Sequence, residues 1–88
     1  MVLLPKATKT SLVKLVRSKG YEVPSIRDAM FSTCGRSRGF FLDWAPKDGE
    51  WHHAYYTGAG GRPVLSVDGK WLELTMAEVI HFGLVEKK

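Results

Sequence analysis

The sequence contains no asparagine and no glutamine among its 88 residues. The amide groups of these side chains make the paired hydrogen bonds by which proteins read adenine in the major groove of DNA. A chain without them has only Arg, Lys, Ser and Thr for contacts with base edges. Any nucleic-acid binding by this chain is therefore expected to be weakly sequence-selective.

Cysteine and long apolar runs are also scarce. Cys34 is the single cysteine, so no disulfide can form within the chain, which is typical of proteins from a reducing compartment. Only three apolar residues separate Met1 from Pro5, far fewer than a signal peptide or a membrane span requires. We therefore expect a cytoplasmic protein with no membrane contact.

The stretch STCGRSRGFF places Cys34 near Arg36 and Arg38, whose charges favour a reactive thiolate. A phosphatase-type loop has an arginine six positions after its cysteine, however, and this chain has Phe40 there. We expect Cys34 to be a small apolar filler at the end of a helix, and both arginines to project into solvent.

Motifs for a metal or a cofactor are absent as well. His52 and His53 are neighbours on a predicted strand, so their side chains point to opposite faces and cannot bind one metal ion. The stretch GAGGR at 58–62 lacks the lysine and the Ser or Thr of a P-loop. The sequence predicts a protein that is not an enzyme, with no catalytic residue, metal or cofactor.

The residues that are plentiful are those of a folded core. Hydrophobic residues make up 44% of the chain, and it holds three Trp, three Tyr and four Phe. A disordered chain has far fewer, and 88 residues are enough for one small core but not for two. We expect one domain over residues 1–88, with Trp71 among the core residues.

Positive charge is concentrated in the first half of the sequence. The whole chain has a net charge of +4, but residues 1–40 hold eight basic and two acidic side chains, and residues 41–88 hold five and seven. One end of the molecule is therefore expected to be basic, as suits contact with a phosphate backbone or with an acidic protein surface. A solvated basic face is the alternative.

Apolar spacing predicts a helix over residues 10–19. The apolar residues of SLVKLVRSKG recur at helical spacing, Thr10 or Ser11 can cap its beginning, and Gly20 suits its end. In the next segment Ser25 and Asp28 form a shortened capping box.

The capping box formed by Ser25 and Asp28 predicts a second helix over residues 25–33. Together the two helices define a basic unit over 10–35.

Beyond this unit the apolar period changes from 3.6 to 2, which predicts two β-hairpins over 39–57 and 63–74. The second hairpin turns at Asp68-Gly69, a pair typical of two-residue turns. A helix over 75–84, with a capping box from Thr75, closes the chain. The residues expected to pack it on the sheet are Met76, Val79 and Ile80. The predicted fold is α+β, in the order ααββββα.

This order of elements resembles winged-helix architecture, with the two N-terminal helices as a helix-turn-helix unit and the first hairpin as the wing. The resemblance implies binding of nucleic acid, DNA rather than RNA, through contacts with phosphates. The residues predicted to make these contacts are Lys14, Arg17, Lys19, Arg27, Arg36 and Arg38.

Two alternatives remain open. Aromatic side chains could stack on the bases of single strands. The same aromatic and basic residues could instead dock on an acidic face of a larger enzyme and modulate or inhibit it, because Trp, Tyr and Arg anchor protein interfaces. The residues predicted for stacking or for such an interface are Trp44, Trp51, Tyr55, Tyr56 and Arg62.

Overall fold

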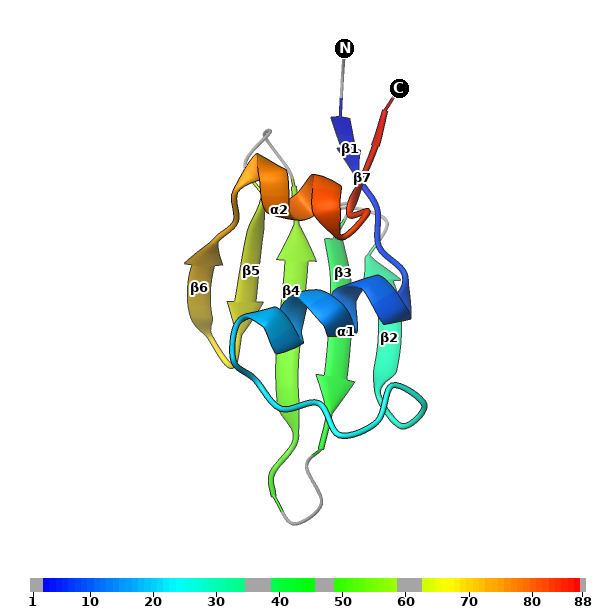
Figure 1. Cartoon of the computed structure of the whole chain (residues 1–88). Helices are drawn as coiled ribbons and strands as arrows, with labels where there is room; N and C mark the ends of the chain where they lie inside the picture. The colour runs from blue at the N-terminus through cyan, green and yellow to red at the C-terminus, as the bar shows by residue number, and fades with distance from the viewer. Residues whose placement is uncertain (1–2, 35–38, 46–48, 59–62, 88) are drawn as a thin grey trace.

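The elements of the chain are shown in Figure 1 for the computed structural model, which describes residues 3–34, 39–45, 49–58 and 63–87. In chain order they are β1 (Leu3–Pro5), α1 (Lys9–Ser18), β2 (Met30–Cys34), β3 (Gly39–Trp44), β4 (His52–Thr57), β5 (Val64–Val67), β6 (Lys70–Glu73), α2 (Met76–His81) and β7 (Val85–Lys87). Strands β2 to β6 form an antiparallel sheet in sequence order, and β1 pairs with β7 separately.

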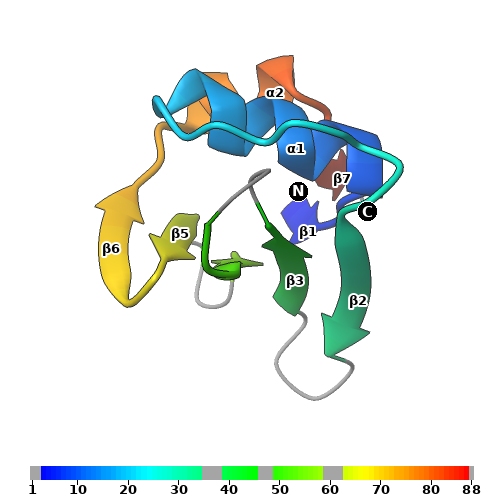
Figure 2. The same cartoon turned by 90° about the horizontal axis from the view of Figure 1, so that it is seen from below.

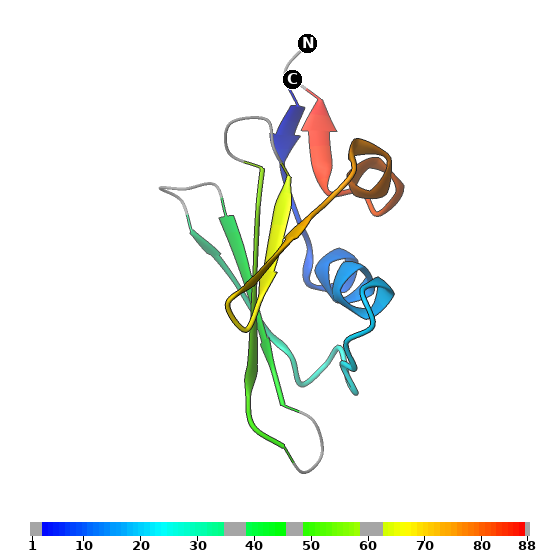
Figure 3. The same cartoon turned by 90° about the vertical axis from the view of Figure 1, so that its left-hand side faces the viewer.

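Both helices cover the same face of the five-stranded sheet, as Figure 2 and Figure 3 show from two directions. We name this face the inner face and the opposite one the outer face. The β1–β7 pair lies beyond one end of the sheet, beside both ends of the chain. A small domain with helices against an antiparallel sheet confirms the predicted α+β class.

Helix α1 confirms the first predicted helix, although its cap is Thr8 and neither Thr10 nor Ser11. The Thr8 hydroxyl accepts a hydrogen bond from the Ser11 N–H at 3.1 Å, and the Ser11 hydroxyl accepts one from the Thr8 N–H at 2.8 Å. Gly20 follows the helix at a φ of +94°, as predicted. The buried stripe on α1 consists of Leu12, Val13, Leu15 and Val16.

The predicted second helix over 25–33 is wrong. Residues 26–28 form a turn, and β2 follows it as an edge strand paired antiparallel with β3. The β2 sequence, MFSTC, holds an aromatic and a β-branched residue, which suit a strand. Pairing with β3 also satisfies backbone groups that a short helix leaves unpaired at both ends.

Without that helix the predicted two-helix unit over 10–35 does not form. The helix-turn-helix expectation therefore has no second helix, and neither the order ααββββα nor the winged-helix resemblance is confirmed. Cys34 likewise lies at the end of a strand and not of a helix.

Both predicted hairpins are present. β3 pairs with β4 from Gly39↔Thr57 to Trp44↔His52, and residues 46–48 between these strands lie outside the described residues. β5 and β6 turn at Asp68-Gly69, with φ angles of 51° and 85°. The predicted two-residue turn is therefore present, and its two successive positive φ angles are those of a type I′ turn.

The core lies between the inner face and the helices. The residues that the sheet contributes to it, all buried, are Leu42, Trp44, Ala54, Tyr56, Leu65 and Val67. Two expectations need correction here, because Trp44 and Tyr56 are not exposed for stacking and Trp71, 63% exposed, is not in the core. The alternation of the strands decides both outcomes.

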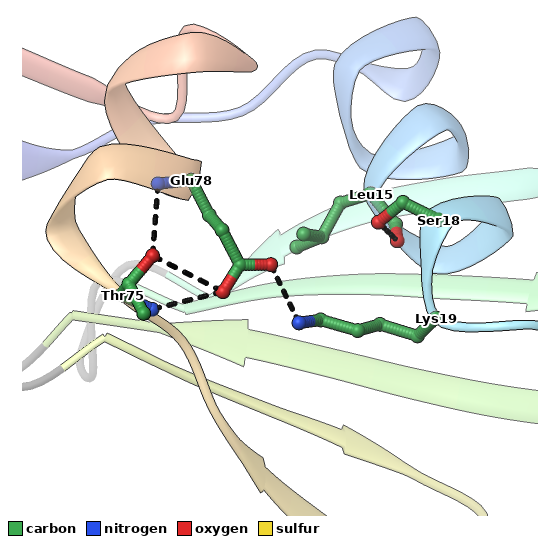
Figure 4. A network of polar contacts seen from close by, with 5 residues as sticks. All are labelled: Leu15, Ser18, Lys19, Thr75 and Glu78. Atoms are coloured by element: carbon green, nitrogen blue, oxygen red, sulfur yellow. Dashed lines mark hydrogen bonds and ion pairs between the residues drawn. The ribbon is translucent and has the colours of Figure 1, made fainter.

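Helix α2 is joined to the residue that follows α1 by a charged contact, drawn in Figure 4. Its cap is Thr75, whose hydroxyl accepts a hydrogen bond from the Glu78 N–H at 3.1 Å, as the sequence predicted. The Glu78 carboxylate in turn lies 2.5 Å from the Nζ of Lys19. This hydrogen bond from Lys19 is the main reason why the pKa of Glu78 is lowered.

The predicted packing of α2 on the sheet is only partly right. Val79 is fully buried, but Met76 and Ile80 are 40% and 60% exposed. The helix has six residues, and Leu84, just beyond its end, supplies the other buried side chain. Ile80 therefore faces solvent.

We expect Leu84→Ala to lower the free energy of unfolding by about 2–5 kcal/mol, because it empties a buried site. Ile80→Ala is the matched control and should change it by no more than about 0.5 kcal/mol. Urea unfolding of both variants measures the difference. Equal losses would show that α2 docks through a different face.

Tyr56 connects the central strand to the terminal segments. Its hydroxyl donates a hydrogen bond to the carbonyl oxygen of Leu84 at 2.6 Å, and the same oxygen accepts one from the Lys6 N–H at 3.0 Å. Burial raises the pKa of Tyr56 from 10.0 to about 12. The neutral phenol is thus the form that the fold stabilises.

Tyr56→Phe should lower the free energy of unfolding by about 0.5–1.5 kcal/mol at neutral pH, since one hydrogen bond is lost. Because the pKa is raised in the folded state, the contribution of Tyr56 is complete below pH 10 and is lost as the pH rises towards 12. Urea unfolding between pH 8 and 12 should show a smaller alkaline loss for Tyr56→Phe than for the parent. Tyr21→Phe, the control, should keep the parental loss.

Candidate binding surface on the outer face

The outer face carries a row of side chains that crosses all five strands. The register aligns the residues Ser32, Phe41, Tyr55, Ser66 and Trp71 side by side. Neither helix covers this side of the sheet (Figure 3). Three aromatic residues of one cross-strand row therefore face away from the core.

Phe41 and Tyr55 form the centre of this row. Their rings are in contact, with centroids 4.7 Å apart and planes tilted by 39°. Gly39 allows this arrangement, because a Cβ atom at that position would lie 2.3 Å from the Tyr55 hydroxyl and ring edge. The Tyr55 ring thus lies directly over the Gly39 backbone, an aromatic-on-glycine contact across two strands.

Exposed apolar area extends beyond this pair. On the outer face Met30 is 61% exposed, Phe41 38% and Trp71 63%. Large apolar side chains gathered on one face mark interaction sites more often than isolated ones do. These residues, with Tyr55, are named the aromatic surface below.

Among the described residues, the charged groups beside the aromatic surface are carboxylates. Asp43 lies next to Phe41 along β3, with its Oδ1 2.8 Å from the Nδ1 of His53, and Glu73 is exposed at the end of β6. None of the outward-facing strand positions holds Lys or Arg. The described outer face is therefore apolar with an acidic margin.

Asp68, in the turn between β5 and β6, contacts two residues of β4. Its carboxylate accepts a hydrogen bond from the His53 N–H at 2.9 Å and lies 2.6 Å from the Nδ1 of His52. The hydrogen bond with His52 is the main reason why the pKa of Asp68 is lowered. The His52 ring stacks on Trp44, with centroids 5.5 Å apart.

The two histidines therefore contact different carboxylates, His52 that of Asp68 and His53 that of Asp43. This agrees with the prediction that their side chains point to opposite faces of the strand. In the part of the chain that the structure describes, no three His, Cys, Asp or Glu residues come together in a group that could hold a metal ion.

The four described residues among those predicted to contact phosphates do not gather on the outer face. Lys14 is exposed on α1. Arg17 donates two hydrogen bonds to the carbonyl oxygen of Val23, from Nε at 3.1 Å and from Nη2 at 2.5 Å. Lys19 forms an ion pair with Glu78. Arg27 is exposed beside α1, where its carbonyl oxygen accepts a hydrogen bond from Lys9.

The remaining predicted arginines, Arg36, Arg38 and Arg62, lie outside the described residues.

Of the residues predicted for stacking or for an interface, Tyr55 lies on the outer face and Trp51, half exposed, directly precedes β4. The sequence analysis missed Met30, Phe41 and Trp71. The alternation of the strands was the signal for them, but only the register shows which half of each strand faces outward.

No family model, no curated protein and no solved structure matches this chain. Its class is thus defined by its own fold: an α+β protein whose antiparallel sheet is covered by helices on one face and carries an aromatic surface on the other. No helix among the described residues has the length and apolar character needed to cross a membrane.

We expect Gly39→Ala to disturb the aromatic surface, because the new Cβ would displace the Tyr55 ring. Destabilisation by about 1–3 kcal/mol is the expected result, as for other overpacked sites. The aromatic proton signals of Phe41 and Tyr55 should shift together in NMR spectra. Unchanged signals would contradict the contact between Tyr55 and Gly39.

Proposed function

We propose that this chain is a binding protein without enzymatic activity that docks its aromatic surface on another protein. The observation that carries the proposal is the cross-strand row with Phe41, Tyr55 and Trp71 on a sheet face that no helix covers. Aromatic side chains of this kind contribute most of the binding free energy in many interfaces.

The charge beside the row favours a protein partner over a nucleic acid on this face. Phosphates placed there would lie near Asp43 and Glu73, and none of the described outward-facing residues of the sheet is a Lys or Arg that would attract them. Lysine or arginine side chains of a protein could pair with these carboxylates around an apolar centre. The partner we propose therefore has an apolar surface with a basic margin.

Binding of nucleic acid through the six predicted basic residues stays a prediction. The residues that the structure describes hold eight Lys or Arg and eight Asp or Glu, so the net charge of +4 comes from residues outside them. Two of the predicted contacts, Arg17 and Lys19, already bind groups of the chain itself. Such binding would use a surface other than the outer face.

Capture experiments with tagged protein, with and without nuclease, can separate these functions. Phe41→Ala and Trp71→Ala should each weaken a nuclease-resistant, stoichiometric protein complex by about 2 kcal/mol or more. Lys14→Ala and Arg27→Ala, on the helix side, are the controls and should leave that complex unchanged. Circular dichroism of all four variants checks that each one remains folded.

The opposite pattern would overturn docking through the aromatic surface. Nucleic-acid binding predicts that the captured material is lost after nuclease treatment and that Lys14→Ala and Arg27→Ala weaken binding. It also predicts that log K falls with log salt by roughly 0.9 per phosphate contact, so that each of these variants flattens the slope by about one unit.

A further inference from the structure

Strand β2 forms one edge of the five-stranded sheet, and its outer side is open. Among the described strands it pairs only with β3, and it lies at the outside of the sheet in Figure 2. The register with β3 runs without interruption from Met30↔Asp43 to Cys34↔Gly39, so no bulge distorts the strand. A regular edge of this kind can pair with a strand of another chain.

The backbone groups of Phe31 and Thr33 face this open side. In an antiparallel sheet the N–H and C=O of one residue point to one side of the strand, and those of the next residue to the other. The N–H and the carbonyl oxygen of His53 both bond to Asp68, so Asp43, opposite His53, turns its own groups towards β2. The β2 residue opposite Asp43 is therefore bonded to β3, and by alternation Phe31 and Thr33 point away from it. Their N–H and C=O groups have no hydrogen-bond partner among the described residues.

The two edges of the sheet differ in how they are protected. Natural sheets commonly protect an edge strand with charged side chains, proline or a bulge. The other edge, β6, has four residues, and it begins with Lys70 and ends with Glu73, both exposed. β2 has five residues, MFSTC, with neither a charge nor a proline. The sequence therefore protects the β6 edge and leaves the β2 edge able to pair.

We propose that β2 pairs with β2 of a second copy of this chain, antiparallel and with Ser32 beside the two-fold axis. In this register Phe31 of each copy lies opposite Thr33 of the other, so every open backbone group of both strands gains a partner. Like charges opposite each other would weaken such pairing, and β2 has none. Ser32 is exposed and small, which suits the close contact between the two copies at the axis.

This pairing would join the outer faces of the two copies. Ser32 is the first residue of the cross-strand row that continues through Phe41 and Tyr55 to Trp71. The two rows meet at the axis and form one row across both sheets. The proposal does not rest on docking of the aromatic surface, because β2 pairs through its backbone and needs no other protein.

Sedimentation equilibrium of the purified chain tests the dimer, with a reductant present to keep Cys34 as a thiol. The mass should rise from 9.9 kDa towards twice that value as the concentration is raised. Hydrogen exchange of the Phe31 and Thr33 amides should slow over the same concentrations. Both observations are expected because the open N–H groups become bonded only in the dimer.

Thr33→Pro tests the backbone contact. It removes an N–H from the open side of β2, where proline is tolerated, and should weaken dimerisation by about tenfold or more. Thr33→Val keeps the N–H and is the matched control, which should dimerise like the parent. Circular dichroism checks that both variants are folded.

Charge exchange at Ser32 tests the register without changing the backbone. Ser32→Lys and Ser32→Glu each place like charges opposite each other at the axis, so each variant alone should dimerise more weakly than the parent. A mixture of the two should recover the dimer, since a lysine then faces a glutamate. Ser66→Glu, in the same row but on β5, is the control and should dimerise like the parent.

Three results would overturn the proposal: a parent that stays at 9.9 kDa at every concentration, equal dimerisation of Thr33→Pro and Thr33→Val, or no recovery in the Ser32 mixture. The first would leave the β2 edge to a strand of a different protein. A dimer that is lost in Phe41→Ala but kept in Thr33→Pro would show that the copies meet through the aromatic surface, which also contradicts it. Docking on another protein is judged separately, from the capture experiments.

Discussion

The hydrogen bond from the Tyr56 hydroxyl to the Leu84 carbonyl oxygen joins the five-stranded sheet to the terminal segments of the chain. Tyr56 lies on the central strand, and Leu84 lies between α2 and β7. The same oxygen accepts the Lys6 N–H, so the segment after β1 meets the end of α2 at one point. A pair of three-residue strands buries little surface of its own and depends on this anchor.

This anchor determines which face of the sheet stays open. Because Tyr56 points inward, the segments that it holds add to α1 on the inner face, and the chain has no further helix among its described residues for the outer face. An antiparallel sheet tolerates one solvated face, but such a face normally carries polar side chains. Here it carries Phe41, Tyr55 and Trp71, whose apolar area is thus available to a partner.

The elements that the sequence predicted correctly are those whose geometry is determined by a few neighbouring residues. Asp68-Gly69 requires positive φ angles, and Thr75 with Glu78 forms a capping box, so the second hairpin and α2 were predictable from a few residues. The segment 25–33 was not, since its strand depends on pairing with β3, which comes later in the chain. The residues of the aromatic surface were hardest to predict. A shift of one residue in the pairing register of β3 would turn Trp44 outward and its neighbour inward.

Strand β3 shows how one short segment can serve two surfaces. Phe41 and Asp43 point outward to the aromatic surface and its acidic margin, while Leu42 and Trp44 point inward to the core. The strand is rigid because it is paired on both sides, with β2 and with β4. Its alternation therefore holds the two surfaces at fixed positions on opposite faces.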